Sequence, residues 1–170
     1  LHEHLEHLVE ERTRALTAEI AERKQVMVQL NESNERFRQI SENISEVFWM
    51  TDLAKNEILF ISMAYEVIWG RTVDSLYASP QNWINSIHND DRQHVLQAAL
   101  TNQVAGLYDE EYRIVKPDGS VRWVHDRAFP VCNSNGEVYR VVGVAEDITL
   151  RKENEKRIMR LNRIYSVLSG

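Results

Sequence analysis

Residues 107–147 read LYDEEYRIVKPDGSVRWVHDRAFPVCNSNGEVYRVVGVAED, and this stretch decides the fold. It contains three strand-like segments: 107–116, 120–132 and 137–147. The two joints between them end in Asp118-Gly119 and Asn135-Gly136. Asp-Gly and Asn-Gly pairs tolerate the positive φ angles that tight hairpin turns need. The stretch therefore predicts an antiparallel meander of three strands.

The last strand of this meander is apolar on both of its faces. One face would carry Val138, Val142 and Val144, and the other Tyr139, Val141 and Ala145. An antiparallel sheet usually leaves one face in water. We therefore expect short helices to cover one face of the sheet and the long terminal helices to cover the other.

Two shorter apolar runs precede the meander. Residues 47–51 and 57–61 read as strands separated by a turn. Residues 63–87 break into short helical pieces, punctuated by glycine, proline and polar residues. Asp90 and Asp91 then mark the start of a longer helix, because acidic residues in a first turn suit the helix dipole. Strands and helices together predict an α+β domain.

Both ends of the chain read as long helices. Residues 1–43 contain no glycine or proline and are rich in good helix formers, and residues 150–170 are helical again. Apolar side chains recur in both at the spacing of a coiled-coil seam. The predicted dimer seam is Leu16, Ile20, Met27, Leu30, Phe37, Ile158, Leu161, Tyr165 and Leu168. We expect a homodimer through these helices; the alternative is a long helix folded back on its own domain.

Composition excludes several classes of protein. The net charge is −6, from 20 Lys and Arg against 26 Asp and Glu, which argues against a nucleic-acid partner. No run of about 18 apolar residues exists, so we expect no membrane contact within this chain. We expect a cytoplasmic location and leave open a membrane tether upstream. Because the chain opens on Leu1 and stops at Gly170 inside a helical pattern, we read it as a fragment of a longer protein.

Five short motifs, in order, resemble those of bacterial PAS sensor domains of the PAS/PAC type. They are Asn34-Glu35-Arg36-Phe37-Arg38, Ile87-His88-Asn89-Asp90-Asp91-Arg92, Glu111-Tyr112-Arg113, Asp118-Gly119-Ser120-Val121-Arg122-Trp123, and Gly143-Val144-Ala145-Glu146-Asp147-Ile148-Thr149 followed by Arg151-Lys152. Asn89 stands where the family usually has proline, and Leu150 where it usually has glutamate. The resemblance implies a five-stranded antiparallel sheet with short helices on one face. It divides the chain into a signalling helix at 1–43, a PAS domain at 44–149 and an output helix at 150–170.

The resemblance also implies a pocket between the sheet and the short helices. Its expected lining is Phe48, Met50, Phe60, Tyr65, Trp69, Trp83, Tyr112, Trp123 and Val142. Such a pocket would suit a small ligand. The alternative is that these side chains only fill the core, since a small domain needs its aromatic area for stability.

No residue pattern indicates a metal or a cofactor. The Asn-Cys-Arg-Phe-Leu-Gln motif of LOV flavin photosensors is absent, and Cys132 lies at the end of a strand. His94 lies where haem-binding relatives place an axial ligand, but we expect its apolar neighbours to face inward instead. His2, His4 and His7 read as residues of a solvated helix. We therefore expect no metal, no haem and no LOV-type flavin, and leave the ligand unidentified.

The function expected from the sequence is signalling rather than catalysis. No Walker loop, dinucleotide fingerprint, zinc-protease motif or GGDEF motif is present, so we predict no catalytic residue. Asp147, Ile148 and Thr149 are the predicted signal relay, with Asp147 holding the strand-to-helix junction and Thr149 capping the helix. We expect a module that relays a ligand signal, or an upstream conformational change, to a covalently linked diguanylate cyclase or histidine kinase. The alternative is an unliganded module that dimerises and couples its neighbours.

Overall fold

The computed structural model describes residues 2–53 and 57–168, and its contacts divide the chain into the units 1–41 and 42–170. Helix α1 (His2–Asn43) accounts for the first unit. It is one uninterrupted helix, as expected where no glycine or proline intervenes. Ion pairs along its surface, such as Arg23 to Glu19 at 2.7 Å, join residues one helical turn apart. Each such pair adds a few tenths of a kcal/mol to an isolated helix.

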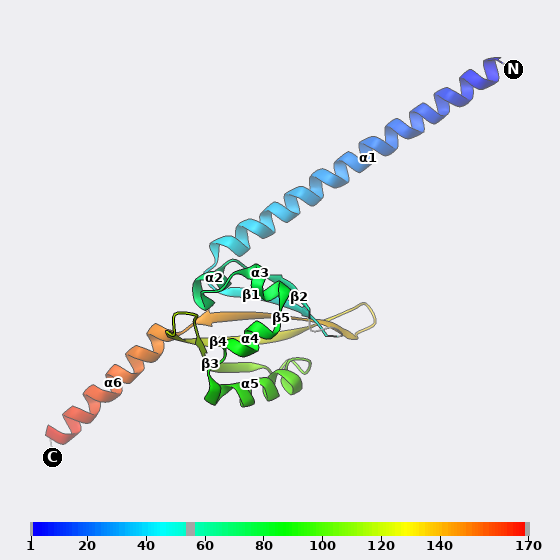
Figure 1. The fold of residues 1–170 in the computed structure, drawn as a ribbon. Helices are drawn as coiled ribbons and strands as arrows, with labels where there is room; N and C mark the ends of the chain where they lie inside the picture. Colours follow the sequence, from blue (N-terminus) through cyan, green and yellow to red (C-terminus); the bar gives the residue numbers. More distant parts are fainter. Residues whose placement is uncertain (1, 54–56, 169–170) are drawn as a thin grey trace. The chain divides into compact units, whose positions relative to one another are not determined.

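The second unit is built on a five-stranded antiparallel sheet of order β2-β1-β5-β4-β3 (Figure 1). The strands are β1 (Val47–Asp52), β2 (Ile58–Ile61), β3 (Asp109–Val115), β4 (Val121–Cys132) and β5 (Val138–Asp147). The predicted meander is confirmed, because β3 pairs with β4 and β4 with β5. Gly119 and Gly136 close the two hairpins at φ angles of 83° and 79°. Only glycine adopts such angles without strain.

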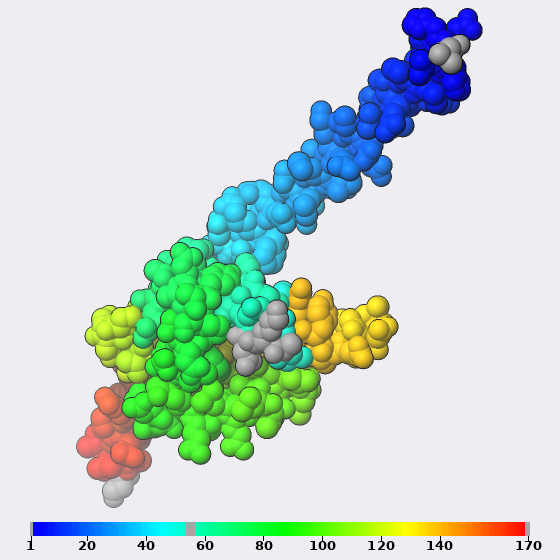
Figure 2. Space-filling model, turned by 45° about the vertical axis from the view of Figure 1, so that its right-hand side comes forward, coloured from blue at the N-terminus to red at the C-terminus, as the bar shows by residue number. Residues whose placement is uncertain are grey.

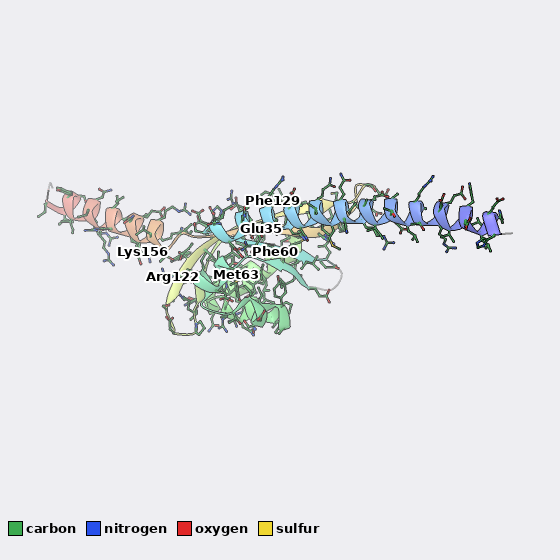
Figure 3. The ribbon with its side chains drawn as sticks, turned by 90° about the horizontal axis from the view of Figure 1, so that it is seen from above. Glu35, Phe60, Met63, Arg122, Phe129 and Lys156 are labelled. Atoms are coloured by element: carbon green, nitrogen blue, oxygen red, sulfur yellow. The ribbon has the colours of Figure 1, made fainter. Side chains whose placement is uncertain are left out.

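Four short helices lie on one face of the sheet, which confirms the expected α+β class (Figures 1 and 3). They are α2 (Ala64–Trp69), α3 (Val73–Ala78), α4 (Gln81–Ser86) and α5 (Asn89–Asn102). The last helix, α6 (Thr149–Leu168), follows β5 directly. Figure 2 shows the β4–β5 hairpin, in yellow and orange, extending past the short helices. No helix in the described residues is long and apolar enough to cross a membrane.

Helix α5 is tied to the sheet through Asp91 at its first turn. Arg113 of β3 donates from Nη2 to Oδ1 of Asp91 at 2.6 Å, and from Nε to Oδ2 at 2.9 Å. The backbone amide of Arg113 also donates to Oδ2, at 2.9 Å. These hydrogen bonds favour the charged carboxylate and therefore lower the pKa of Asp91. The Asp91–Arg113 pair therefore holds the start of α5 against β3.

Side chains along each strand alternate between the two faces of the sheet. On β1, Val47 and Trp49 contribute to the core beneath the short helices. Their neighbours Phe48 and Met50 lie on the other face, where Met50 pairs in register with Phe60 and Val142. Phe129, which is opposite Val142, is 49% exposed and lies away from the short helices (Figure 3). Both faces of the central strands are thus apolar, as the sequence indicated.

Candidate functional site

A cavity of about 480 Å³ lies between the inner face of the sheet and the short helices. This volume falls within the range of about 300–1,000 Å³ that is usual for small-molecule sites. Every strand except β3 and each of helices α2–α5 contributes to its wall. The lining residues are Val47, Trp49, Thr51, Leu53, Ile58, Ile61, Tyr65, Trp69, Leu76, Pro80, Gln81, Trp83, Ile84, Leu96, Ala99, Leu100, Gln103, Val104, Asp126 and Ala145.

A buried carboxylate, Asp126 of β4, forms the polar centre of this cavity. The indole Nε1 of Trp49 donates to its Oδ1 at 2.9 Å. The hydroxyls of Tyr112 and Tyr108 donate to its Oδ2, at 2.9 Å and 3.4 Å. Trp83 donates in turn from Nε1 to the hydroxyl of Tyr112, at 3.0 Å. One carboxylate therefore connects aromatic side chains of β1, β3, α4 and the segment before β3.

Burial sets the protonation of this carboxylate. Asp126 is 2% exposed, and the loss of water around the charged form raises its pKa to about 6, against the lowering effect of the three donors. Burial also raises the pKa of the Tyr108 and Tyr112 hydroxyls, so both stay protonated and act as donors. At neutral pH the centre of the cavity is consequently negative.

Trp49 packs against a position on the neighbouring strand β5 that carries no side chain. It lies opposite Gly143 of β5, and a Cβ built on Gly143 would overlap Cε2 and Cζ2 of the indole. The inner face of β5 continues with the small Ala145, which lines the cavity. Small residues on β5 thus create the room in which the Trp49 ring reaches Asp126.

Three residues of the predicted lining, Tyr65, Trp69 and Trp83, do line the cavity. Tyr112 is fully buried beside it and bonds to Asp126. The other five lie on the opposite face of the sheet: Phe48, Met50, Phe60, Trp123 and Val142. In a strand, a shift of one residue moves a side chain to the other face.

Sequence reasoning missed Trp49, Tyr108 and Asp126. Asp126 stands in the middle of a predicted strand, where an acidic residue suggests an exposed position unless donors surround it. The available signal was the glycine at 143 followed by Ala145, because small residues at every second position mark the face on which bulky partners pack.

At the other end of the sheet, β5 passes directly into α6. The Oδ1 of Asp147 accepts a hydrogen bond from the amide of Thr149 at 2.9 Å. The Thr149 hydroxyl accepts from the amide of Trp123 at 2.9 Å, and the amide of Ile148 donates to the carbonyl of Trp123 at 2.9 Å. Asp147 thus supplies the capping side chain at the start of α6, while the Thr149 side chain extends the pairing with β4. The sequence could not show this arrangement, because it could not show that β4 leaves an amide free at this point.

Charged contacts hold the first turn of α6 against β3 and β4. Glu111 of β3 accepts from Arg151 at 2.6 Å and from Lys152 at 2.5 Å. These bonds, Lys152 first, lower the pKa of the Glu111 carboxyl. The Lys152 Nζ also lies 5.1 Å from the centre of the Trp123 ring, a cation–π distance. Arg122, 3.8 Å from Asp147, lies at the end of the sheet from which α6 leaves (Figure 3).

The remaining predicted residues lie away from the cavity. His94 is an exposed residue 3.8 Å from Glu110, and Cys132 is exposed at the end of β4. In the part of the chain that the structure describes, no three His, Cys, Asp or Glu side chains are grouped to hold a metal ion. The predicted seam side chains lie on α1 and α6 and are 49–78% exposed in the single chain: Leu16, Ile20, Met27, Leu30, Phe37, Ile158, Leu161, Tyr165 and Leu168.

The antiparallel sheet, the cavity between the sheet and the short helices, and the helix that follows the last strand together make up an α+β domain. The family described as the PAS fold matches residues 58–145, more than half of the chain, and the chain belongs to that family. A domain described as belonging to a light and redox sensing histidine kinase from Haloarcula marismortui is 34% identical, with a TM-score of 0.54. The match covers 68% of this chain and 99% of that one. The expected PAS resemblance is thereby confirmed.

Two further proteins are similar to this chain. The N-terminal domain of a diguanylate cyclase with PAS/PAC sensor from Marinobacter aquaeolei shares the fold at a TM-score of 0.58 and 23% identity, over 63% of this chain and 98% of that one. A blue-light-activated histidine kinase from Brucella anthropi is 30% identical over 79% of this chain and 26% of its own length. The chain spans about a quarter or less of the length of these curated relatives.

Proposed function

We propose that this chain is a cytoplasmic sensor module that passes a change in its cavity through Asp147, Ile148 and Thr149 to a covalently linked output domain. The similar proteins are described as histidine kinases or as a diguanylate cyclase with PAS/PAC sensor, and we propose one of these two activities for the output domain. The catalytic chemistry then belongs to that domain. This chain contributes ligand recognition and the conformational response.

The observation that carries this proposal is the double role of β4. Asp126 faces the cavity from this strand, and Trp123, three residues earlier, binds the start of α6 through both its amide and its carbonyl. A ligand that draws Asp126 or its donors into a new position would displace the same strand that holds α6. Since interfaces of this kind adopt discrete arrangements, a small displacement can become a reorientation of the helix.

The relay is tested by combining Asp147→Ala with a cavity substitution in the whole protein. We expect Trp49→Phe alone to change basal output, measured both as autophosphorylation from ATP and as cyclic-di-GMP formation from GTP. With Asp147→Ala present, the same substitution should change neither, because the helix start is no longer held by its cap. The loss of the cap itself costs about 1 kcal/mol of folding stability.

Two variants complete this experiment. Asp147→Asn keeps a capping side chain and should preserve the response to Trp49→Phe. Asn133→Ala removes comparable hydrogen bonds, which the amides of Asn135 and Glu137 donate to the Asn133 side chain in the β4–β5 turn. This turn lies at the opposite end of β5 from α6, so the variant should also preserve the response. An output that still responds to Trp49→Phe when Asp147 is alanine would rule out this relay.

We further propose that α1 and α6 pair two copies of the chain, because their seam side chains are 49–78% exposed in one copy. A native mass spectrum should show a dimer that Leu16→Glu and Ile20→Glu together convert to monomer. Ala18→Glu, about half a turn around the helix, should leave the dimer intact. A monomeric wild-type chain would contradict the paired helices.

The same spectrum bears on the alternative function. A dimer whose mass shows no bound ligand, together with a failed Asp147 experiment, would favour the unliganded coupling module.

A further inference from the structure

The wall of the cavity combines one negative charge with an aromatic surface. Among the described residues that line it, Asp126 alone carries a formal charge. Four aromatic residues share the wall with it, from β1, α2 and α4: Trp49, Tyr65, Trp69 and Trp83. Apolar residues make up most of the remainder. A ligand for this site must therefore be largely apolar and compatible with a buried carboxylate.

Asp126 lacks a cationic partner within the part of the chain that the structure describes. Its three donors are neutral groups of Trp49, Tyr112 and Tyr108. His125 and Arg127 flank Asp126 on the strand with their side chains on the other face, where His125 bonds to Asp109 at 2.5 Å. The electrostatic effect of His125 on Asp126 is smaller than that of the three donors. A carboxylate offers about four acceptor positions, so at least one stays open on Asp126. An unpaired buried charge is costly, and a bound cation would offset that cost.

The aromatic residues suit the same kind of ligand. The faces of Trp and Tyr rings attract organic cations, and aromatic side chains are a common means of holding ammonium groups. Tyr65 and Trp69 of α2 are stacked on each other at a centroid distance of 5.1 Å and an interplanar angle of 21°, and both line the cavity. The part of this stacked pair that lines the cavity, the Tyr65–Trp69 surface, offers the body of a ligand an apolar place to pack.

An independent observation concerns the Tyr65 hydroxyl. Tyr65 is 1% exposed and lines the cavity, yet its hydroxyl oxygen has no hydrogen-bond partner in the structure. Buried hydroxyls are almost always bonded, because leaving one unpaired costs about 1–3 kcal/mol. Burial raises the pKa of this hydroxyl to about 12, so it is a donor at physiological pH. A ligand acceptor would satisfy it.

We propose that the cavity binds a small organic ammonium ion with an aromatic or aliphatic body. Its ammonium group donates to the open acceptor position of Asp126, its body packs on the Tyr65–Trp69 surface, and a hydrogen-bonding atom on the body accepts from Tyr65. This inference rests on the proposed sensor function and names the chemical class of its ligand. A carboxylate ligand would be repelled by Asp126, and a plain hydrocarbon would leave both polar groups unpaired.

Three probes that share one hydroxyphenyl body test the role of charge: cationic tyramine, neutral tyrosol and anionic phloretate. Isothermal titration of the chain at neutral pH should show tyramine binding about tenfold or more tightly than tyrosol, a difference of about 1.4 kcal/mol, with phloretate weakest. Asp126→Asn keeps the side-chain shape and should reduce tyramine affinity to that of tyrosol. Tyr65→Phe should weaken tyramine and tyrosol by a similar, smaller factor.

Asp74→Asn is the matched control, because Asp74 is an exposed carboxylate on α3 outside the cavity lining. It should leave all three affinities unchanged. A second readout needs no variant: tyramine should shift the indole N–H resonances of Trp49 and Trp83 in the wild-type chain. This readout applies even if Asp126→Asn fails to fold.

Equal binding of tyramine and tyrosol, a preference for phloretate, or binding of none of the three would overturn the ammonium assignment. A tyramine preference that survives Asp126→Asn would overturn it as well. The Asp147 experiment uses no ligand, so its failure would reject the relay and leave the ligand class standing. Failure of the titrations would reject the ligand class and leave the relay standing.

Discussion

Gly143→Ala is expected to lower the free energy of unfolding by about 3 kcal/mol, because the new methyl group would overlap the indole of Trp49. The ring cannot simply move aside. Its Nε1 donates to Asp126 at 2.9 Å, and losing a hydrogen bond to a buried charged group costs about as much as tolerating the overlap. For a domain of this size the melting temperature should fall by about 12 °C or more, as measured by circular dichroism.

Gly136→Ala provides the comparison for this experiment. Gly136 has a positive φ angle of 79° but nothing within 4 Å of a Cβ, so its substitution carries backbone strain without a clash. It should cost only about 1 kcal/mol. In a Trp49→Phe background the smaller ring should make Gly143→Ala markedly less destabilising. Equal melting temperatures for Gly143→Ala and Gly136→Ala would show that the close packing of Trp49 on β5 is incorrect.

The stability of the wild-type chain should decline relative to Asp126→Asn as the pH rises from about 4 to about 7. Asp126 has a folded-state pKa of about 6 against an ordinary value of 3.8, so between these values the folded state holds a proton that the unfolded state has lost. The stabilisation is fully present below the lower value and is lost as the pH passes the higher one. The total change is about 3 kcal/mol, since one pKa unit corresponds to about 1.4 kcal/mol.

Urea unfolding at several pH values measures this difference. The comparison with Asp126→Asn is needed because Asp91 and Glu111 have lowered pKa values, and their stabilising contributions are lost in acid instead. The groups that face Asp126 are the Trp49, Tyr108 and Tyr112 donors, with His125 behind it on the strand. Parallel stability curves for the two proteins, or an Asp126 carboxyl that titrates near 4 by carbon NMR, would refute the prediction.

Local signals made most of the fold predictable. Asp118-Gly119 and Asn135-Gly136 are hairpin signals that act within a few residues, so they identified the meander before any packing was known. The run 1–43 lacks helix-breaking residues, and a helix requires nothing further for its existence to be predicted. The order of the β-strands in the sheet was not predicted, because the pairing of β1 with β5 joins residues that lie far apart in sequence.

The cavity was less predictable, and β1 shows why. Val47, Phe48, Trp49 and Met50 are all apolar, so alternation could not tell which of them faces inward. The answer depends on Asp126 and Gly143, which meet Trp49 only once three strands are assembled. The polar centre was missed for the same reason, since the buried position of Asp126 is made acceptable by donors from other elements.

Because the amide and carbonyl of Trp123 are bound by Thr149 and Ile148, the first residues of α6 belong to the hydrogen-bonded sheet as much as to the helix. When modules from two such proteins are fused, the junction is therefore best placed after Lys152, where the contacts with Glu111 and Trp123 end. A hybrid joined at Asp147 would replace Ile148 and Thr149 by residues of the other protein. The Trp123 amide would then keep a hydrogen-bond partner only if the residue at position 149 could accept from it. A hybrid joined one helical turn later would inherit the native joint intact, whichever output domain is attached.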